Sequence, residues 1–409
     1  MTAHGTSRPG GVVITAAAAL APIGFGLAEF KRGLRRSEHR LGEVTLFSEE
    51  PEAKGLRGGE LTGFDPKAIM AAKGLRYMDR NTLIILSCMK LDLETVLAQL
   101  GEREQVGFTI GTTYGSLRSQ IDFPVTYLTQ GFKALNAMDF PNMVINAPPS
   151  QGNIWWELPH SSTTISNAFT AGVDAVVFAT DMIRTGQARQ MIAGGSDEFS
   201  LHTALAFARR GLASASGQVR PFDARHDGTL LGEGAAMVLL EERAIAEQRG
   251  ASIRAEVLGS GSTFDGRSEF AFHPEGEGAA HAMQLALEEA GITADQVDFI
   301  AASANGSPEG DRMEARAIER VFGARGRQVP VVAYKSYVGE CFGATGAMQI
   351  VAALCDLEDG IISATCGYGS GSEGLNVTRT PVTGASPKVV MVNSFGYTGH
   401  NSSLILRKA

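Results

Sequence analysis

The residues from Arg220 to Glu241 read RPFDARHDGTLLGEGAAMVLLE, a polar segment with three glycines followed by an apolar run. The run, Ala236–Glu241, is typical of a buried strand. Glycine is abundant along the whole chain: 49 of 409 residues, about one in eight, where ~7% is usual. We therefore expect many tight turns and close backbone approaches.

The composition is that of an ordinary globular protein. Apolar residues make up 44% of the chain and charged residues 20%, and 36 Lys+Arg against 44 Asp+Glu give a net charge of −8. These values exclude a disordered, collagen-like or coiled-coil chain. The length exceeds what one hydrophobic core usually supports, so two core-forming halves are expected. The acidity argues against nucleic acid as the main partner.

Short apolar runs alternate with helical patterns, which predicts an α/β fold. A second series of elements begins near Ala251 and repeats the first in order, so we expect a duplication with halves 1–250 and 251–409. The pattern of Ala168–Thr185, apolar on nearly every side, predicts a central buried helix, and amphipathic Gly278–Ala290 predicts an outer one. The expected strands are Gly11–Thr15, Gln105–Gly111, Gln190–Gly194, Ala236–Glu241, Val297–Ala302, Val329–Ala333, Val389–Asn393 and Ser402–Arg407, and the other helices are Met78–Leu97, Asp311–Phe322 and Gly343–Asp356.

Two features bear on the compartment. The apolar stretch Gly10–Phe30 has a signal-peptide-like composition, but Pro22, Gly24 and Gly26 interrupt it, and a spanning helix needs ~20 apolar residues. A buried strand, a turn and a helix starting near Gly26 explain the same letters. The four cysteines (Cys88, Cys341, Cys355, Cys366) form no CxxC pair, and the eight histidines form no ligand motif. We expect a cytoplasmic protein with reduced thiols and neither a metal nor a membrane span.

Four ordered stretches carry a resemblance to a known family. Arg220–Glu241 is similar to RPFDxxRDGFxxGEGAxxxxLE, and Ile183–Glu198 (IRTGQARQMIAGGSDE) is similar to IRxGxADxMxAGGxE. Ala301–Phe322 contains ASANGSPEGDRMEARAIERVF, which resembles AHGTxTxxGDxxEAxAI. The last stretch is a pair, KSYVGECFGATGAMQ from Lys335 and NSFGYTGHNSSLIL from Asn393. Together they resemble the β-ketoacyl–acyl-carrier-protein synthases, the condensing enzymes of fatty acid and polyketide assembly.

The resemblance implies a thiolase-like fold, with two duplicated α/β halves stacked in αβαβα layers, normally as a dimer. It also implies a cysteine thiolate at a buried helix N-terminus, where the helix dipole lowers its pKa and it takes up the acyl chain. Two histidines then promote decarboxylation of a malonyl thioester and stabilise the enolate charge.

The expected catalytic residues are absent from this chain. Counting back from Gly194, the nucleophile's position is Phe169, whose ring has no lone pair for a covalent intermediate. The first histidine is replaced by Asn305, in a loop two residues shorter than the family pattern, and the second by Glu340. Glu340 would place negative charge beside a forming enolate. We therefore expect that this chain does not condense substrates alone.

Other residues of the family patterns are retained. Lys335, Ser394, Gly396 and His400 are present, and we expect them to hold loop geometry. Gln349 stands where the family usually has glutamate, which indicates that the polar network of the active site has changed.

An intact scaffold without the reactive groups resembles the chain length factor, or KSβ, of type II polyketide synthases. Such a subunit pairs with a catalytic ketosynthase, KSα, and together they form the tunnel for the growing polyketide. Aromatic-polyketide members usually carry Gln in place of the Cys, whereas Phe169 stands here. That departure is compatible with the KSβ subunits of polyene-type or Gram-negative type II systems. Pairing of this kind follows when a symmetric dimer interface diverges after gene duplication.

The resemblance also implies candidate tunnel residues. Aligning on the trailing Gly131 places three gate positions at Leu117, Gln120 and Pro124, after the strand Gln105–Gly111. Core packing of a helix is the alternative reading of these three. Tyr397 occupies the position of the family's gatekeeper aromatic residue, where we expect a static packing role.

No cofactor is expected, and the carrier protein is expected to bind mainly through the partner subunit. Acyl carrier proteins are acidic, so a chain of charge −8 repels them unless a basic patch intervenes. The one dense basic run is Lys31–Arg40, KRGLRRSEHR, which a solvated helix face explains.

Three alternatives remain open. A malonyl–carrier-protein decarboxylase that primes synthesis would need the two missing histidines. A homodimeric, divergent β-ketoacyl synthase or acyltransferase would need relocated chemistry, for example at His160 or Ser166, where no Ser–His–acid arrangement is discernible. The third is a stand-alone binding protein for acyl chains.

Overall fold

The computed structural model describes residues 11–71, 73–100, 105–266, 271–371 and 373–409. The strands are β1 (Val12–Ala21), β2 (Gly24–Phe25), β3 (Gly42–Glu43), β4 (Arg57–Gly58), β5 (Val106–Gly111), β6 (Ser162–Ile165), β7 (Gln190–Asp197), β8 (Gly234–Glu242), β9 (Ala255–Phe264), β10 (Phe299–Ala301), β11 (Pro330–Val332), β12 (Ile361–Ile362), β13 (Asn376–Val377), β14 (Val382–Thr383), β15 (Val389–Phe395) and β16 (His400–Lys408). The α-helices are α1 (Leu27–Arg36), α2 (Pro66–Met70), α3 (Arg80–Asp92), α4 (Glu94–Gln99), α5 (Leu117–Gln130), α6 (Ala147–Trp156), α7 (Ala171–Arg184), α8 (Leu201–Arg209), α9 (Arg243–Gln248), α10 (Glu277–Ala290), α11 (Pro308–Phe322), α12 (Lys335–Val338) and α13 (Gly343–Asp359).

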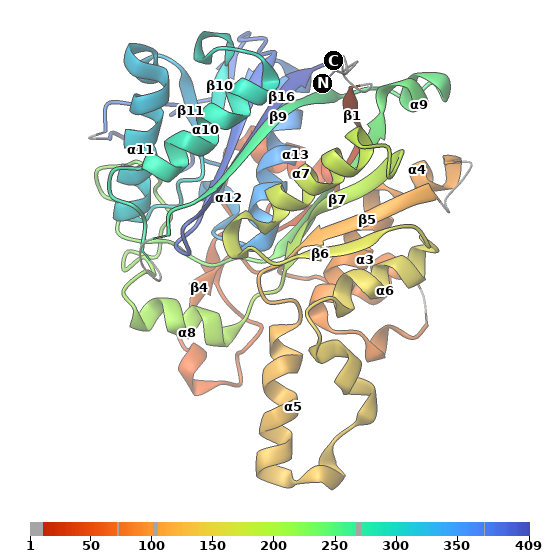
Figure 1. Cartoon of the computed structure of the whole chain (residues 1–409). Helices are drawn as coiled ribbons and strands as arrows, with labels where there is room; N and C mark the ends of the chain where they lie inside the picture. The colour runs from red at the N-terminus through yellow and green to blue at the C-terminus, as the bar shows by residue number, and fades with distance from the viewer. Residues whose placement is uncertain (1–10, 72, 101–104, 267–270, 372) are drawn as a thin grey trace.

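Most strands join one sheet made of two similar halves (Figure 1). The first half runs β1-β8-β7-β5-β6 and the second runs β9-β16-β15-β10-β11-β13. Each half begins with two antiparallel pairings and continues with parallel ones. A short antiparallel pairing of β1 with β9, between residues 12–14 and 255–257, joins them. The repeated order of strand directions agrees with a duplicated chain, and the predicted boundary near residue 250 falls between α9 and β9.

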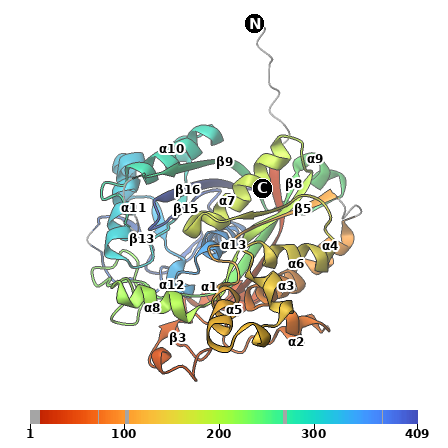
Figure 2. The same ribbon diagram turned by 60° about the horizontal axis from the view of Figure 1, so that its bottom comes forward.

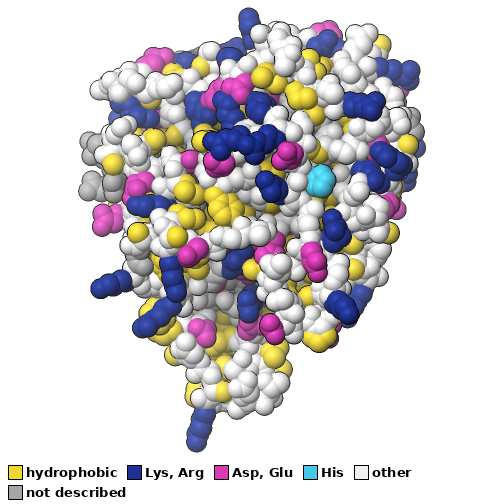
Figure 3. Space-filling model, turned by 180° about the vertical axis from the view of Figure 1, so that it is seen from behind, with side chains coloured by type: hydrophobic (Ala, Val, Ile, Leu, Met, Phe, Trp, Pro, Cys, Tyr) yellow, Lys and Arg dark blue, Asp and Glu magenta, His cyan; other side chains and the backbone are white. Residues whose placement is uncertain are grey.

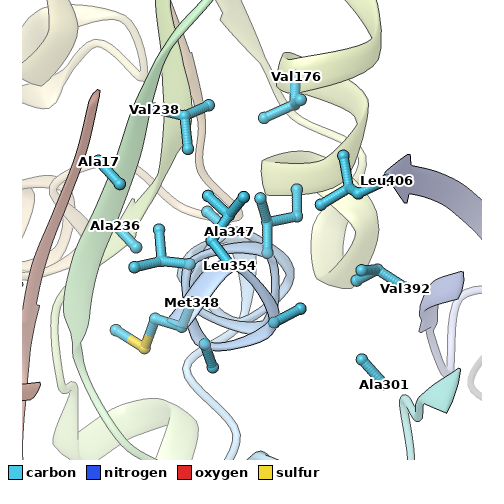
Figure 4. Close-up of a cluster of buried hydrophobic side chains, with 14 of the residues drawn as sticks. Ala17, Val176, Ala236, Val238, Ala301, Ala347, Met348, Leu354, Val392 and Leu406 are labelled. Carbon is cyan, nitrogen blue, oxygen red and sulfur yellow. The ribbon is translucent and has the colours of Figure 1, made fainter. Parts of the chain in front are cut away.

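Two helices lie between the halves and form the centre of the core. The helix α13 packs against β7 and β8 of one half and β15 of the other, and α7 packs against β5, β7 and β16. Figure 4 shows Ala236 and Val238 on one side of α13 and Val392 and Leu406 on the other. Figure 2 shows α10 and α11 outside one half and α3 and α6 outside the other. The predicted order of helix, sheet, helix, sheet and helix layers is confirmed.

Most predicted elements begin or end a few residues away from their bounds in the structure, and three of these differences matter most for the fold. The predicted helix Met78–Leu97 is wrong as a single helix, because α3 ends at Asp92, whose carboxylate accepts the backbone N–H groups of Leu27 and Ala19. The central helix begins as α7 at Ala171 after a 3-10 turn, η6 (Ala168–Thr170). Within Gly10–Phe30, of which Gly10 lies outside the described residues, β1 runs through Ala21.

Glycine allows the central helices to approach each other closely. A Cβ atom on Gly172 of α7 would lie 2.3 Å from the carbonyl oxygen of Gly343, and one on Gly195 would lie 2.0 Å from the same atom. Side chains are therefore excluded where β7, α7 and α13 meet, as the glycine content predicts. This junction lies directly beside the predicted catalytic positions.

One segment projects from the layers. It comprises α5 with two 3-10 helices, η4 (Phe132–Ala134) and η5 (Ala137–Met143), and we call it the α5 protrusion (Figure 1). No residue of α5 is buried. Among the described residues, no helix combines the length and apolar character needed to cross a bilayer.

Candidate functional site

The predicted nucleophile position, Phe169, lies in a sharp turn just before α7. Ala168 has φ of 53° in the left-handed region, which is unfavourable for a residue with a Cβ atom. The α-helix begins two residues after Phe169, and the Phe169 side chain is only 2% exposed. The hydroxyl of Ser394 donates to the carbonyl oxygen of Phe169 at 3.1 Å. A strained turn therefore directs the Phe169 ring into the interior.

The Phe169 ring is the centre of an aromatic cluster. Its centroid lies 5.5 Å from that of Phe342 and 5.4 Å from that of Tyr397. Phe207 lies edge-on to both of these rings, at 5.8 and 6.0 Å. The backbone of Gly396 also approaches closely, because a Cβ atom there would stand 2.8 Å from the Phe169 ring. Aromatic carbon fills the space around this position.

The two predicted histidine replacements meet in a buried polar network. The carboxylate of Glu340 accepts hydrogen bonds from Asn305 Nδ2 at 3.0 Å, from Lys335 Nζ at 2.8 Å and from Thr345 Oγ1 at 2.8 Å. Lys335 and Glu340 are each 1% exposed. Both oxygens of Glu340 are thus engaged, and the lysine charge is neutralised by a carboxylate within the site.

Tyr397 connects the aromatic cluster to the polar network. Its hydroxyl faces Asn305 and Ser307, and burial raises the pKa of Tyr397 above its usual value. The rings of Phe272 and Tyr397 lie 4.5 Å apart, so the side chain is enclosed by packing. The predicted packing role of Tyr397 is consistent with this enclosure.

Cys341 is next in sequence to Glu340, but its thiol is not activated. Burial, together with the charges of Glu340 and Glu233, raises the pKa of Cys341 well above its usual value. Its Sγ atom lies 3.7 Å from the carbonyl oxygen of Glu233. Because the thiolate is the nucleophilic form, this cysteine does not replace the missing one.

Gln349 and Glu314 hold the adjacent strand ends together. Gln349 Nε2 donates to the carbonyl oxygens of Ala302 and Asn393 at 2.7 and 3.1 Å, contacts that a glutamate oxygen cannot make. Glu314 Oε1 accepts the backbone N–H of Ser303 at 2.9 Å and Asn393 Nδ2 at 3.0 Å. Burial raises the pKa of Glu314 to about 7.

The predicted gate residues lie outside the buried cluster. Leu117, Gln120 and Pro124 are all on α5, which follows β5, and each is at least partly exposed. The side chain of Gln120 turns back and donates to the carbonyl oxygen of Tyr114 at 2.6 Å. The Tyr114 ring lies 5.4 Å from that of Phe342, so Gln120 links the gate helix to the aromatic cluster through Tyr114.

Sequence reasoning did not identify Phe342, Phe207 or Asp197 as parts of this region. Asp197, at the end of β7, accepts the backbone N–H groups of Thr113 and Gly343, both at 2.8 Å. It thereby ties the loop before α5 to the start of α13. The acidic pair Asp197–Glu198, directly after the AGGS sequence of β7, was the available signal for Asp197. Phe342 stands at a position that the quoted family pattern leaves open, and Phe207 lies outside the quoted stretches.

The basic run Lys31–Arg40 is largely paired with acidic residues. Lys31 pairs with Asp359, and Arg35 pairs with Asp356 at 2.6 Å and with Asp359 at 2.9 Å. Figure 3 shows basic and acidic side chains interspersed on the face opposite to that of Figure 1. These pairings support the prediction of a solvated helix face.

The Lys335–Glu340 pair predicts strongly non-additive effects on stability. Lys335→Met should lower the free energy of unfolding by about 3–5 kcal/mol, because Glu340 stays buried without its cation. Lys335→Met combined with Glu340→Met should recover most of this loss, as measured by chemical denaturation. The exposed Lys90–Glu94 pair is the control, and Lys90→Met should cost less than about 1 kcal/mol. Additive losses at Lys335 and Glu340 would contradict this coupling.

Glu314 predicts a pH dependence of stability. Its pKa is raised from 4.5 to about 7, so the folded state favours the protonated acid. The contribution of Glu314 to stability is therefore greatest below about pH 4.5 and is lost as the pH rises to about 7. The difference in unfolding free energy between the wild type and Glu314→Gln should fall by about 3 kcal/mol over this range. A difference that stays constant or rises with pH would show that the carboxyl group is not protonated in the folded protein.

Comparisons with known proteins agree with this architecture. The family model for the β-ketoacyl synthase N-terminal domain matches residues 10–246, and that for the C-terminal domain matches residues 254–369. The 3-oxoacyl-[acyl-carrier-protein] synthase 2 of Coxiella burnetii is 29% identical over 97% of this chain and 98% of its own length.

Solved structures are similar over nearly the whole length. The ishigamide ketosynthase/chain length factor matches with a TM-score of 0.91 and 28% identity, over 98% of this chain and all of the other. A β-ketoacyl synthase from Burkholderia phymatum matches with a TM-score of 0.89 and 27% identity, over 98% and 100%. With its thiolase-like ketosynthase fold and both domain models matched, the chain belongs to the β-ketoacyl synthase family.

Proposed function

We propose that this chain is a non-catalytic chain length factor that pairs with a catalytic ketosynthase in a type II polyketide synthase and shapes the tunnel for the growing chain. The observation that carries the proposal is the burial of Phe169 within an aromatic cluster, at the position aligned with the family's nucleophilic cysteine. A phenyl ring forms no thioester, so an acyl chain has no covalent attachment point at this position.

The polar side of the site supports the same proposal. Decarboxylation of a malonyl thioester needs hydrogen-bond donors directed at a developing negative charge. Here Glu340 supplies negative charge instead, and its oxygens already bind Lys335 and Asn305. Both donors that face the site are thereby committed to a carboxylate. This arrangement also argues against the decarboxylase alternative.

The surface of the α5 protrusion supports a partner subunit. Leu128 and Phe132 are 78% and 79% exposed, and Ile154 on the neighbouring α6 is 72% exposed. Val125, Tyr127, Met138, Phe140 and Val144 are also exposed. Several large apolar side chains exposed on one projecting segment are typical of a protein interface. The strand β6 ends the sheet next to β5 and leaves an edge to which another strand can add.

The similar solved structures support the assignment, because one of them is a ketosynthase/chain length factor pair. The curated relatives favour a second candidate, since they are 3-oxoacyl-[acyl-carrier-protein] synthases. A homodimeric synthase would need a nucleophile other than Phe169. Cys341 is unactivated, and Ser166 donates its hydroxyl to the carbonyl oxygen of Thr113 at 3.3 Å rather than to a base.

Carrier-protein docking belongs mainly to the partner subunit in this proposal. The net charge is −8, and the densest basic run is already paired with acids of its own chain. Crosslinking with a reactive pantetheine probe should therefore label the ketosynthase subunit.

Coexpression tests the proposed assembly. Coexpressed with a candidate catalytic ketosynthase, the chain should form a 1:1 complex, whereas alone it should be insoluble or self-associated through the exposed protrusion. Leu128→Glu together with Phe132→Glu should weaken the complex at least about tenfold, since both side chains would be desolvated as charges. Size-exclusion chromatography with light scattering measures the stoichiometry of the complex and its loss in the double variant. A stable, active homodimer of the chain alone would contradict the proposal.

A bulk series at Leu117 tests the gate. In the reconstituted complex, Leu117→Trp should shift products to shorter chains and Leu117→Ala to longer ones, because the side chain sets how far the tunnel extends. Mass spectrometry of the products gives the lengths. Leu91, partly exposed on α3, is the matched control, and Leu91→Trp should leave the products unchanged. Identical product lengths across the Leu117 series would remove the gate assignment.

A further inference from the structure

Helix α5 is attached to the rest of the molecule through its first turn. It has no buried residue, and the elements with which it shares extensive contacts, η4 and η5, belong to the same protrusion. The loop before it is held by Asn81, which donates to the carbonyl oxygen of Gly115 at 2.9 Å, and by Asp197, which accepts the N–H of Thr113. The placement of its gate residues therefore depends on how its N-terminal end is held.

The helix does not cap itself. Ser116 is the N-cap residue, yet its side chain makes no capping hydrogen bond, although serine is among the best N-cap residues. The acceptor for a free N–H group of the first helical turn comes instead from a residue far away in the sequence. Glu198, immediately after β7, accepts the backbone N–H of Arg118 at 3.0 Å through Oε1. A carboxyl oxygen at this end also interacts favourably with the helix dipole.

Glu198 is buried, so its carboxyl group is costly to keep in the charged form. Its side chain lies near Asp79, Glu233 and Arg80, but Arg80 is bound to both oxygens of Glu233, at 2.6 and 2.8 Å. Burial foremost, with Asp79 and Glu233 adding to it, raises the pKa of Glu198 to about 8. At neutral pH the group is therefore mostly the uncharged acid. An amide of the same shape keeps the acceptor oxygen.

We propose that Glu198 is a positioning residue, which fixes the first turn of α5 and thereby sets where Leu117 and Gln120 stand in the chain tunnel. This inference rests on the proposed chain-length function. Glu198 acts through the backbone of Arg118, while Gln120 adds a second tie to the preceding loop through the carbonyl oxygen of Tyr114. Losing the first tie leaves the turn free to tilt or fray.

The test compares Glu198→Ala with Glu198→Gln in the reconstituted 1:1 complex. Glu198→Ala should speed amide hydrogen exchange in the first turn of α5 about tenfold, as expected for loss of a helix cap. It should also move the most abundant product by at least one extension step or spread it over neighbouring lengths. Glu198→Gln should restore both readouts nearly to wild type, because it retains the acceptor oxygen.

The matched control is Asp65→Ala, which removes the side-chain cap of α2. It should lower the melting temperature without altering the product profile. Equal shifts in Asp65→Ala and Glu198→Ala, or unchanged exchange and products in Glu198→Ala, would overturn the proposal. If the Leu117 series changes product length and Glu198→Ala does not, the positioning role alone is wrong. If the Leu117 series changes nothing, the gate assignment on α5 fails, while the exchange measurement still reports on the cap.

Discussion

Close packing of aromatic carbon beside the start of α7 governs this region of the molecule. The Phe169 ring lies between Phe342 and Tyr397 and against the backbone of Gly396. Loops from both sheet halves converge there, so filling this space turns a would-be reaction chamber into part of the core. The buried Lys335 then needs a counter-charge, and Glu340 provides it.

Under the proposed function, such a protomer shapes the complex instead of carrying out the reaction. Its aromatic cluster fills the aligned nucleophile position, and large apolar side chains are exposed on the α5 protrusion. Quasi-symmetric pairing makes such specialisation possible, because an interface once shared by identical subunits can join an active subunit to an inactive one. Two acids at the end of β7, Asp197 and Glu198, link the central layer to the base of that protrusion. Their carboxyl groups accept main-chain N–H groups of the loop before α5 and of its first turn.

Much of this architecture could be predicted from the sequence, because long motifs recur in order and glycines mark the junction of β7, α7 and α13. The central position of α7 followed from its apolar pattern, whereas the placement of the candidate gate residues after β5 was implied by the family resemblance. The end of α3 could not be predicted, since it depends on Asp92 binding backbone groups far away in the chain. The hydrogen bonds around the Lys335–Glu340 pair and the rings around Phe169 also depend on tertiary contacts between residues far apart in the chain.

The most direct measurement of where the chemistry resides is to locate the acyl group. The purified 1:1 complex is incubated with an acylated carrier protein, and intact-mass and peptide mass spectrometry then identify the modified residue. The account predicts a thioester on the ketosynthase partner and an unmodified chain here, both in the complex and alone. An acyl adduct on any residue of this chain, formed at a rate that matches turnover, would contradict it.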